Sequence, residues 1–313
     1  PLDWWRYVCS GIDKLCTQEK IEKSDISGIG ISYQMHGLVL IDKEGNPLRK
    51  SIIWCDSRAV GIGQHAYEEM GGKTCNSHLL NSPSNFTASK LKWIKENEPD
   101  IYAQIYKMML PGDFIAYKLS GVVNTTVSGL SEGIFWDFKS DAIAEILLDH
   151  YGLEKEMIPD IVDTFSVQSK VNEKGASESG LQIGTPILYR AGDQPNNALT
   201  LNVFNPGEVA ATGGTSGVVY AVTDNLSVKE SSRVNNFAHV NYSPGKPARI
   251  GKLLCINGAG IQYRWLLNNL NVSSYEEMNI LANEVPIGCD GVSMIPFGNG
   301  AERMLESKEV GTR

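Results

Sequence analysis

The chain has 313 residues, more than one small core requires and about the length of two domains. With 42% hydrophobic residues, 20% charged residues and a formal net charge of −8, it is typical of a soluble globular protein and lacks the basic surface of a nucleic-acid binder. No apolar run approaches the roughly 20 residues of a membrane span, and the six cysteines form no Cys-x-x-Cys pair, which argues against a zinc or thioredoxin-like site and suits a reducing cytosol.

The first half of the chain alternates between amphipathic segments and short apolar runs. Apolar residues at helical spacing predict a helix over residues 4–21. Short strands are expected over residues 26–33, 38–42 and 51–54, and residues 121–138 read as turns and extended chain. Further helices are expected over residues 57–70, with Asp56 or Ser57 as the cap, and over 89–97, 100–106, 112–119 and 140–151.

The second half begins with a polar segment. Residues 152–184 contain few long apolar runs, so we predict an irregular connector that contains the domain boundary. Strands are expected again over 186–193, 209–211 and 218–222, and helices over 256–268 and 274–284. Strands alternating with helices predict an α/β fold of two lobes, residues 1–184 and 185–313, with a ligand-binding cleft between them.

Two clusters in the second half carry the residue types of phosphoryl transfer. Asp193 ends a strand, where its carboxylate can act as a base, although an Asp in this place is often only a helix N-cap. A run of small residues supplies backbone N–H groups and hydroxyls that can hold phosphate: Gly213, Gly214, Thr215, Ser216 and Gly217. The same run can be a plain hairpin turn. A base beside a phosphate cradle is the minimal layout of a phosphoryl-transfer enzyme.

Two clusters in the first half offer a wall for a polyhydroxyl ligand. Gln34, Met35 and His36 follow a predicted strand and combine an amide, a soft apolar chain and an imidazole. Trp54, Asp56 and Arg58 combine an aromatic face with a carboxylate and a guanidinium. A structural histidine and an ion pair at a helix start are the alternatives.

Other enzyme classes fit the sequence poorly. Gly28-Ile29-Gly30 lacks the third glycine of the dinucleotide fingerprint. There is neither a P-loop motif nor the Gly-x-Ser-x-Gly elbow of α/β-hydrolases.

At these residues the chain resembles the FGGY carbohydrate kinases, over essentially its whole length. The matching motifs are Gln34-Met35-His36-Gly37, Trp54-x-Asp56-x-Arg58, Lys90-x-x-Trp93, Leu110-Pro111-x-Asp113, Gly192-Asp193 and Gly214-Thr215-Ser216-Gly217. The resemblance implies two actin-like (ribonuclease H-like) lobes, both incomplete in this chain. It also implies that Asp193 is the base, that Met35, His36 and Asp56 line a ketose site, and that Thr215 and its neighbours face the phosphates of ATP. The lobes of this family close over the sugar and ATP with its Mg²⁺.

The resemblance implies ATP-dependent phosphorylation of a ketopentose, with D-xylulose to D-xylulose 5-phosphate as the first choice. The alternatives are another sugar or polyol, such as gluconate or ribulose, and a non-catalytic sugar-binding relative. Gln194 stands where Asn commonly follows the catalytic Asp, which leaves the exact pentulose open. We expect a cytoplasmic protein whose partners are a sugar and ATP, with no nucleic acid or membrane, and a homodimer is one option for its assembly.

Two motifs of the family are absent. The first is the Asp-x-Gly-Thr strand that holds Mg²⁺ and phosphate, and the second is a Gly-Gly adenosine loop. We therefore expect an internal fragment of a longer kinase that is inactive by itself.

Overall fold

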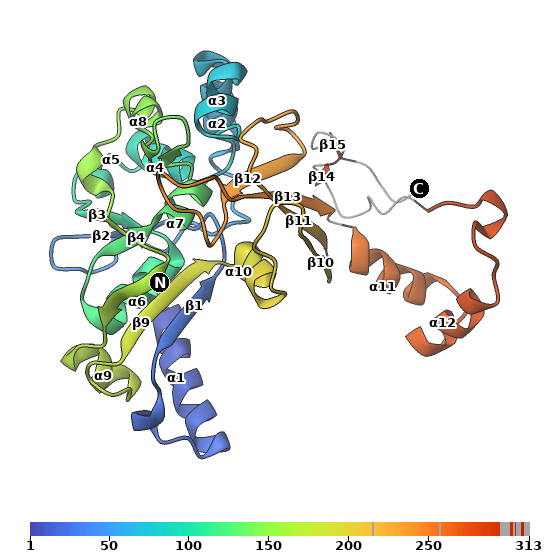
Figure 1. The fold of residues 1–313 in the computed structure, drawn as a ribbon, viewed down its shortest axis with the longest axis horizontal. Coiled ribbons are helices and arrows are strands. Elements are labelled where there is room, and N and C mark those ends of the chain that lie inside the picture. The colour runs from blue at the N-terminus through green and yellow to red at the C-terminus, as the bar shows by residue number, and fades with distance from the viewer. Residues whose placement is uncertain (215, 257, 295–300, 303, 305–307, 310–313) are drawn as a thin grey trace.

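The computed structural model describes the chain except for residues 215, 257, 295–300, 303, 305–307 and 310–313 (Figure 1). A three-stranded sheet lies in the N-terminal part, in the order β1 (Ile29–Tyr33), β9 (Pro186–Gly192), β8 (Phe165–Lys170). β1 runs parallel to β9, and Tyr33 is paired with Gly192. Both strands therefore end at the same edge of the sheet, where the residues that follow them meet.

Three helices and one face of this sheet form a hydrophobic core. α6 (Pro111–Ser120) packs on β1 and β9, and α1 (Leu2–Glu19) and α9 (Glu173–Ser179) pack against α6. Alternate residues of β1 are buried, as the period of a strand requires. The core includes Trp5, Ile31, Tyr33, Phe114, Leu119 and Ile187.

A second sheet is antiparallel and lies beyond α10 (Asp193–Thr200). Its strands lie in the order β10 (Val209–Gly213), β11 (Gly217–Thr223), β13 (Ile250–Ile256), β12 (Val234–Ala238). The larger core cluster includes residues of this sheet, such as Tyr220 and Phe237, together with Met35 and Leu91 from the first half. The predicted division at residues 184 and 185 falls just before β9, which is paired with both β1 and β8. That division stays a prediction.

Helices surround this larger core in the upper part of Figure 1. They are α2 (Val60–Met70), α3 (Gly72–His78), α4 (Thr87–Asn97), α5 (Pro99–Tyr102), α7 (Val127–Glu132) and α8 (Glu145–Tyr151). Short strand pairs join them: β2 (Val39–Ile41) with β3 (Lys107–Met109), β4 (Asn124–Thr126) with β7 (Asp160–Val162), and β5 (Trp136–Asp137) with β6 (Ala142–Ile143). The remaining elements are the 3₁₀ turns η1 (Lys23–Asp25), η2 (Lys155–Met157) and η3 (Cys289–Gly291), and the strands β14 (Ala301–Glu302) and β15 (Lys308–Glu309).

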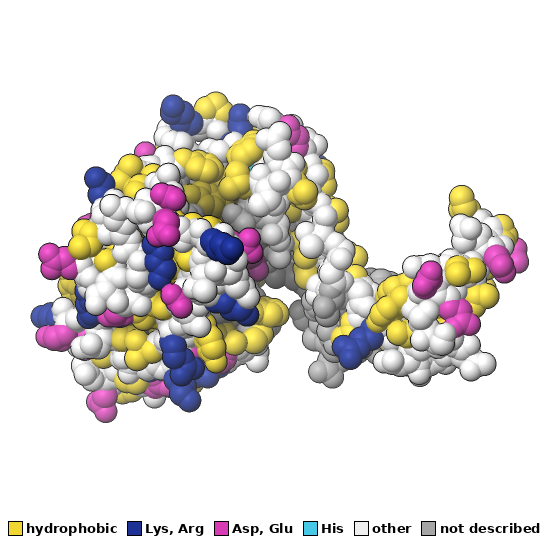
Figure 2. All heavy atoms as spheres, turned by 90° about the horizontal axis from the view of Figure 1, so that it is seen from below, with side chains coloured by type: hydrophobic (Ala, Val, Ile, Leu, Met, Phe, Trp, Pro, Cys, Tyr) yellow, Lys and Arg dark blue, Asp and Glu magenta, His cyan; other side chains and the backbone are white. Residues whose placement is uncertain are grey.

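Two helices project from the second sheet. α11 (Ala259–Asn269) and α12 (Tyr275–Asn283) stand apart from the main body, as Figures 1 and 2 show. The rings of Tyr263 and Tyr275 stack at 4.9 Å between centroids and join the two helices. Large apolar side chains remain exposed on the two helices and at the C-cap of α11: Trp265, Leu270, Ile280 and Leu281. Throughout the described residues, each helix is too short or too polar to cross a bilayer.

Some sequence-based predictions were wrong. The segment predicted to be an irregular connector contains β7, β8 and α9. β8 was missed because it buries little of its surface, so its composition is polar. Residues 51–54 form only one isolated bridge, between Leu38 and Ile52, in place of a strand. α2 begins three residues later than predicted, at Val60, and its N-cap position belongs to Ala59, whose side chain cannot accept a hydrogen bond. Asp56 accepts the Arg58 N–H instead. Residues 121–138 include the short helix α7.

Two glycines of α2 differ in the space around them, which gives a matched stability test. A Cβ on Gly63 would lie 1.9 Å from the main-chain oxygen of Ser84, whereas nothing lies within 4 Å of one on Gly61. We expect Gly63→Ala to lower the free energy of unfolding by about 1–3 kcal/mol through forced backbone movement. Gly61→Ala should raise it by about 0.4–1 kcal/mol, since alanine restricts the unfolded chain. Urea unfolding of both variants checks this, and equal effects would contradict the close packing at Gly63.

Candidate active site

The parallel pairing of β1 with β9 brings together residues that are distant in sequence. Because Tyr33 pairs with Gly192, the turn that starts at Gln34 lies next to Asp193 (Figure 1). A cavity of about 230 Å³ opens at this edge. Its lining residues are Gln34, Met35, His36, Trp54, Asp193, Gln194, Ser216, Val218, Leu253 and Cys255. Seven of these ten were predicted from the sequence as site residues.

Asp193 is the first residue of α10 and is half-buried. The N-cap position belongs to Gly192, and no side chain caps this helix, so the structure gives Asp193 no capping role. Burial raises the pKa of the Asp193 carboxyl above its ordinary value, and the main-chain N–H groups of Gln194 and Asp193 oppose part of that rise. A carboxylate with a raised pKa at a cavity wall is suited to accept a proton.

Gly192, the residue before Asp193, has no side chain and so lets the side chains of Glu132 and Met35 lie close to its main chain. A Cβ at Gly192 would lie 2.3 Å from Oε2 of Glu132 and 2.5 Å from Cγ of Met35. Glu132, on α7, is only 1% exposed. Burial raises the pKa of Glu132 well above its ordinary value, and the Asp193 carboxyl raises it further. The Gly-Asp dipeptide therefore brings the Asp193 carboxyl to the cavity next to the one residue type that fits against Met35 and Glu132.

His36 is held in a left-handed backbone conformation, with φ of 61°. Its Nδ1 lies 2.8 Å from the carbonyl oxygen of Glu132. Because a carbonyl only accepts, Nδ1 carries a proton and donates it. The imidazole also packs edge-on against Phe86, at 4.7 Å between centroids, and lies tilted against Phe237 at 5.3 Å. The ring orientation at the cavity wall is thus fixed from several sides.

The second predicted sugar cluster divides in the structure. Trp54 lines the cavity and is 60% exposed, so its indole is accessible. Asp56 and Arg58 do not line it, and two hydrogen bonds of 2.8 Å join the guanidinium of Arg58 to the carboxylate of Asp56. Arg58 also stacks on Trp93 at 4.5 Å. The sugar-binding role of Asp56 and Arg58 stays a prediction.

The glycine-rich run forms the hairpin between β10 and β11. Gly213 pairs with Gly217, and the Gly214 N–H donates to the Ser216 carbonyl oxygen at 3.0 Å. Ser216 lines the cavity, Gly213 and Gly214 are exposed, and Thr215 lies outside the described residues. The hairpin alternative is therefore correct as a description of the backbone, and it also brings a hydroxyl to the cavity that holds Asp193.

Several residues near the cavity were not predicted. Val218, Leu253 and Cys255 line it from β11 and β13, and alternation along those strands is the signal that could have identified them. The Nζ of Lys90 donates hydrogen bonds to the carbonyl oxygens of His36 and Ile53. Its position on the same helical face as Phe86 and Ile94 was the signal, because a lysine in an apolar stripe is unusual.

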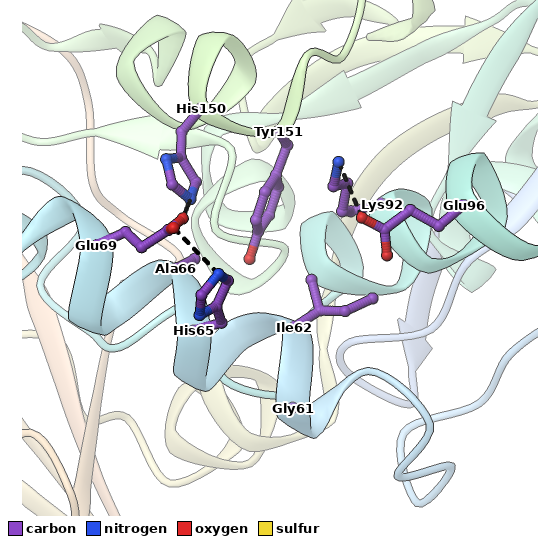
Figure 3. Close-up of a pocket in the computed structure, with 9 residues that line it drawn as sticks. All are labelled: Gly61, Ile62, His65, Ala66, Glu69, Lys92, Glu96, His150 and Tyr151. Carbon is purple, nitrogen blue, oxygen red and sulfur yellow. Dashed lines mark ion pairs between the residues drawn. The ribbon is translucent and has the colours of Figure 1, made fainter.

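A second, larger hollow lies away from these residues. It holds about 390 Å³ and is lined from α2, α4 and α8 (Figure 3). In Figure 3 His65 and His150 point at Glu69 from opposite sides, with Nε2–carboxylate distances of 3.1 Å and 3.5 Å. None of the predicted site residues lines it. In the described part of the chain, no three His, Cys, Asp or Glu side chains come together as metal ligands.

Known proteins resemble the chain in sequence and in structure. Residues 1–200 match the N-terminal domain of the FGGY family of carbohydrate kinases. The chain is 30% identical over 282 residues to the xylulose kinase of Haemophilus influenzae, covering 88% of this chain and 55% of that protein. It is 28% identical over 276 residues to the xylulose kinase of Staphylococcus xylosus, covering 88% and 56%. The chain thus spans about half the length of the curated relatives it matches.

A solved structure shows the shared fold. The xylulose kinase from Rhodospirillum rubrum superimposes with a TM-score of 0.85 at 23% identity, covering 100% of this chain and 63% of that chain. The predicted α/β class and actin-like architecture are thereby confirmed. The match over residues 1–200 shows that the chain belongs to the FGGY family of carbohydrate kinases.

Proposed function

We propose that the complete protein transfers the γ-phosphoryl group of ATP to a ketopentose, with D-xylulose as the first choice and D-xylulose 5-phosphate as the product. One observation carries this proposal: the register of β1 with β9 brings the Gln34–His36 turn and Asp193 to one cavity. Membership of the FGGY kinases and the printed names of the relatives support it. The cavity volume of about 230 Å³ favours a small substrate.

The proposed mechanism assigns the proton transfer to Asp193. Its carboxylate accepts the proton of the terminal sugar hydroxyl, and the hydroxyl oxygen forms a bond to the γ-phosphorus of ATP. The bond between that phosphorus and the β–γ bridging oxygen breaks, and ADP leaves. The raised pKa of Asp193 makes it a better proton acceptor than an exposed aspartate.

The sugar would lie between the Gln34–His36 turn and Trp54. The Trp54 indole offers a flat apolar face for the carbon side of a sugar, and it is accessible. His36 and the amides of Gln34 and Gln194 offer hydrogen-bonding atoms for hydroxyls. These roles are proposals from position and chemistry.

The phosphate side is proposed for the β10–β11 hairpin. Ser216 shares the cavity with Asp193, and Gly213, Gly214 and Gly217 are its neighbours in the hairpin, while Thr215 precedes it in the sequence. Mg²⁺ would arrive as part of the Mg–ATP substrate and neutralise phosphate charge.

A substrate panel tests the proposal. The purified complete protein is given ATP with D-xylulose, D-ribulose, gluconate or glycerol, and sugar-dependent ADP release is measured. We expect the highest kcat/KM with D-xylulose, and the Asp193→Asn variant serves as the control for contaminating kinases. A clear preference for another acceptor would move the substrate assignment to that compound. Sugar binding without ADP release would support the non-catalytic sugar-binding alternative.

A further inference from the structure

A buried lysine lies directly behind the sugar side of the cavity. Lys90, on α4, is 0% exposed. Its Nζ donates to the carbonyl oxygen of His36 at 2.8 Å and to that of Ile53 at 3.0 Å. Among the described residues, no carboxylate lies within ion-pair distance of Lys90. Its closest polar contacts are therefore two main-chain carbonyl groups.

These two carbonyls belong to the two segments that form the sugar side. His36 itself lines the cavity, and Ile53 directly precedes Trp54, which also lines it. The main-chain hydrogen bonds between these two segments join Leu38 and Ile52, which are two residues after His36 and one residue before Ile53. Lys90 thus joins the segments at the point nearest the cavity.

The start of α4 supports the His36 turn through other groups as well. The Thr87 hydroxyl donates to the Gly37 carbonyl oxygen at 3.4 Å, and the Phe86 ring packs on the imidazole. The left-handed φ of His36 is costly for a residue other than glycine, so it persists only where the surroundings hold it. A donor on the His36 carbonyl is one such restraint.

An amine at this position is expensive for the fold. Burial lowers the pKa of Lys90 to about 8 although the nearby Asp56 charge opposes part of that fall, which records the cost of keeping a charge in this buried position. An apolar residue would avoid that cost but would leave two buried carbonyl groups without this donor. A costly group that acts on both cavity segments indicates a role in the site.

We propose that Lys90 is a positioning residue that sets the spacing between His36 and Trp54, and so the width of the sugar site. This rests on the proposed sugar-kinase function. It assigns Lys90 an effect on sugar binding and none on the proton transfer, because Asp193 lies on α10 and is not bonded to Lys90.

The test is Lys90→Met in the complete protein, compared with Lys92→Met. Lys92 lies on the same helix, its Nζ forms an ion pair with Oε1 of Glu96 at 3.0 Å, and both side chains are partly exposed. We expect Lys90→Met to raise the sugar KM and the calorimetric Kd by about tenfold or more, the fold-change for losing charge-assisted hydrogen bonds. kcat and the KM for ATP should change less than about threefold. Lys92→Met should change none of them.

Other results would overturn the proposal. An unchanged sugar KM in Lys90→Met, or an equal fall in kcat/KM for both substrates, would show that Lys90 has no specific effect on the sugar side. If Lys90→Met does not fold, Lys90→Gln takes its place. Glutamine keeps two N–H donors but is uncharged and shorter, so a sugar KM equal to that of wild type in this variant would also overturn the spacing role. If the wild-type protein binds no sugar, the proposed function and this inference are both overturned. If the wild-type protein binds the sugar and the Lys90 variant binds it equally well, only the inference is overturned.

Discussion

Asp193→Asn in the complete protein is expected to lower kcat for sugar phosphorylation by about 10²–10⁴-fold, the range of a general-base contribution. Asparagine has nearly the shape of aspartate but cannot take up the proton of the attacking hydroxyl. Because the residue is half-buried and caps no helix, the fold should be little affected. Steady-state kinetics with D-xylulose and ATP measure the loss, and the sugar Kd should stay within about threefold.

The pH dependence gives a second measurement of the same residue. The pKa of Asp193 is raised, so its carboxylate takes up a proton as the pH falls through a value above the ordinary one of about 3.9. We expect kcat/KM of wild type to fall on the acid side with a midpoint above that value, and the residual activity of Asp193→Asn to lack this limb. Asp224→Asn, at an exposed loop position, is the matched control. Near-normal kcat in Asp193→Asn would remove the residue from the role of base.

Breaking the ion pair beneath the first sheet is expected to have the largest effect on stability. Arg190 on β9 is 0% exposed and Asp113 on α6 is 2% exposed, and Nε lies 3.0 Å from Oδ1. Asp113 also accepts the Leu110 N–H at 3.1 Å. Asp113→Ala leaves a guanidinium that cannot lose its proton in a dry site, so we expect it to lower the free energy of unfolding by about 3–5 kcal/mol.

Urea unfolding measures this loss, and two comparisons separate its causes. Arg190→Met should cost less, because the remaining Asp113 can take up a proton and become neutral, whereas the guanidinium in Asp113→Ala cannot. The double variant Asp113→Leu with Arg190→Met should recover part of the stability, since no charge is then buried. Glu230→Ala, which breaks the more exposed pair with Arg233, should cost at most about 1 kcal/mol. Similar losses for the exposed and buried pairs would contradict this account.

The local parts of the site could be predicted from the sequence. Gly192-Asp193 and Gln34-Met35-His36 each follow a strand, and short apolar runs closed by polar residues are visible without a structure. The hairpin at Gly213–Gly217 could also be predicted, because glycine and serine between two apolar runs are typical of a turn. In each case the signal and the structure involve neighbouring residues.

The parts that depend on distant residues could not be predicted. Lys90 stands out as a lysine in an apolar stripe, but its partners, the carbonyl groups of His36 and Ile53, are 54 and 37 residues away in sequence and are known only from the structure. Glu132 carries no local signal at all, since its role depends on the absence of a side chain at Gly192. Pairing between distant segments decides these cases.

The pairing of β1 with β9 also has a consequence for how the site comes into existence. Gln34 and Asp193 become neighbours only when two strands separated by most of the N-terminal half of the chain meet in one register. The helices between them can form from local contacts, but closing so long a loop must precede the pairing, and contacts of this kind form slowly. A chain that has formed only its helices therefore does not yet have Asp193 next to the Gln34–His36 turn, and we expect the proposed site to form only when β1 pairs with β9.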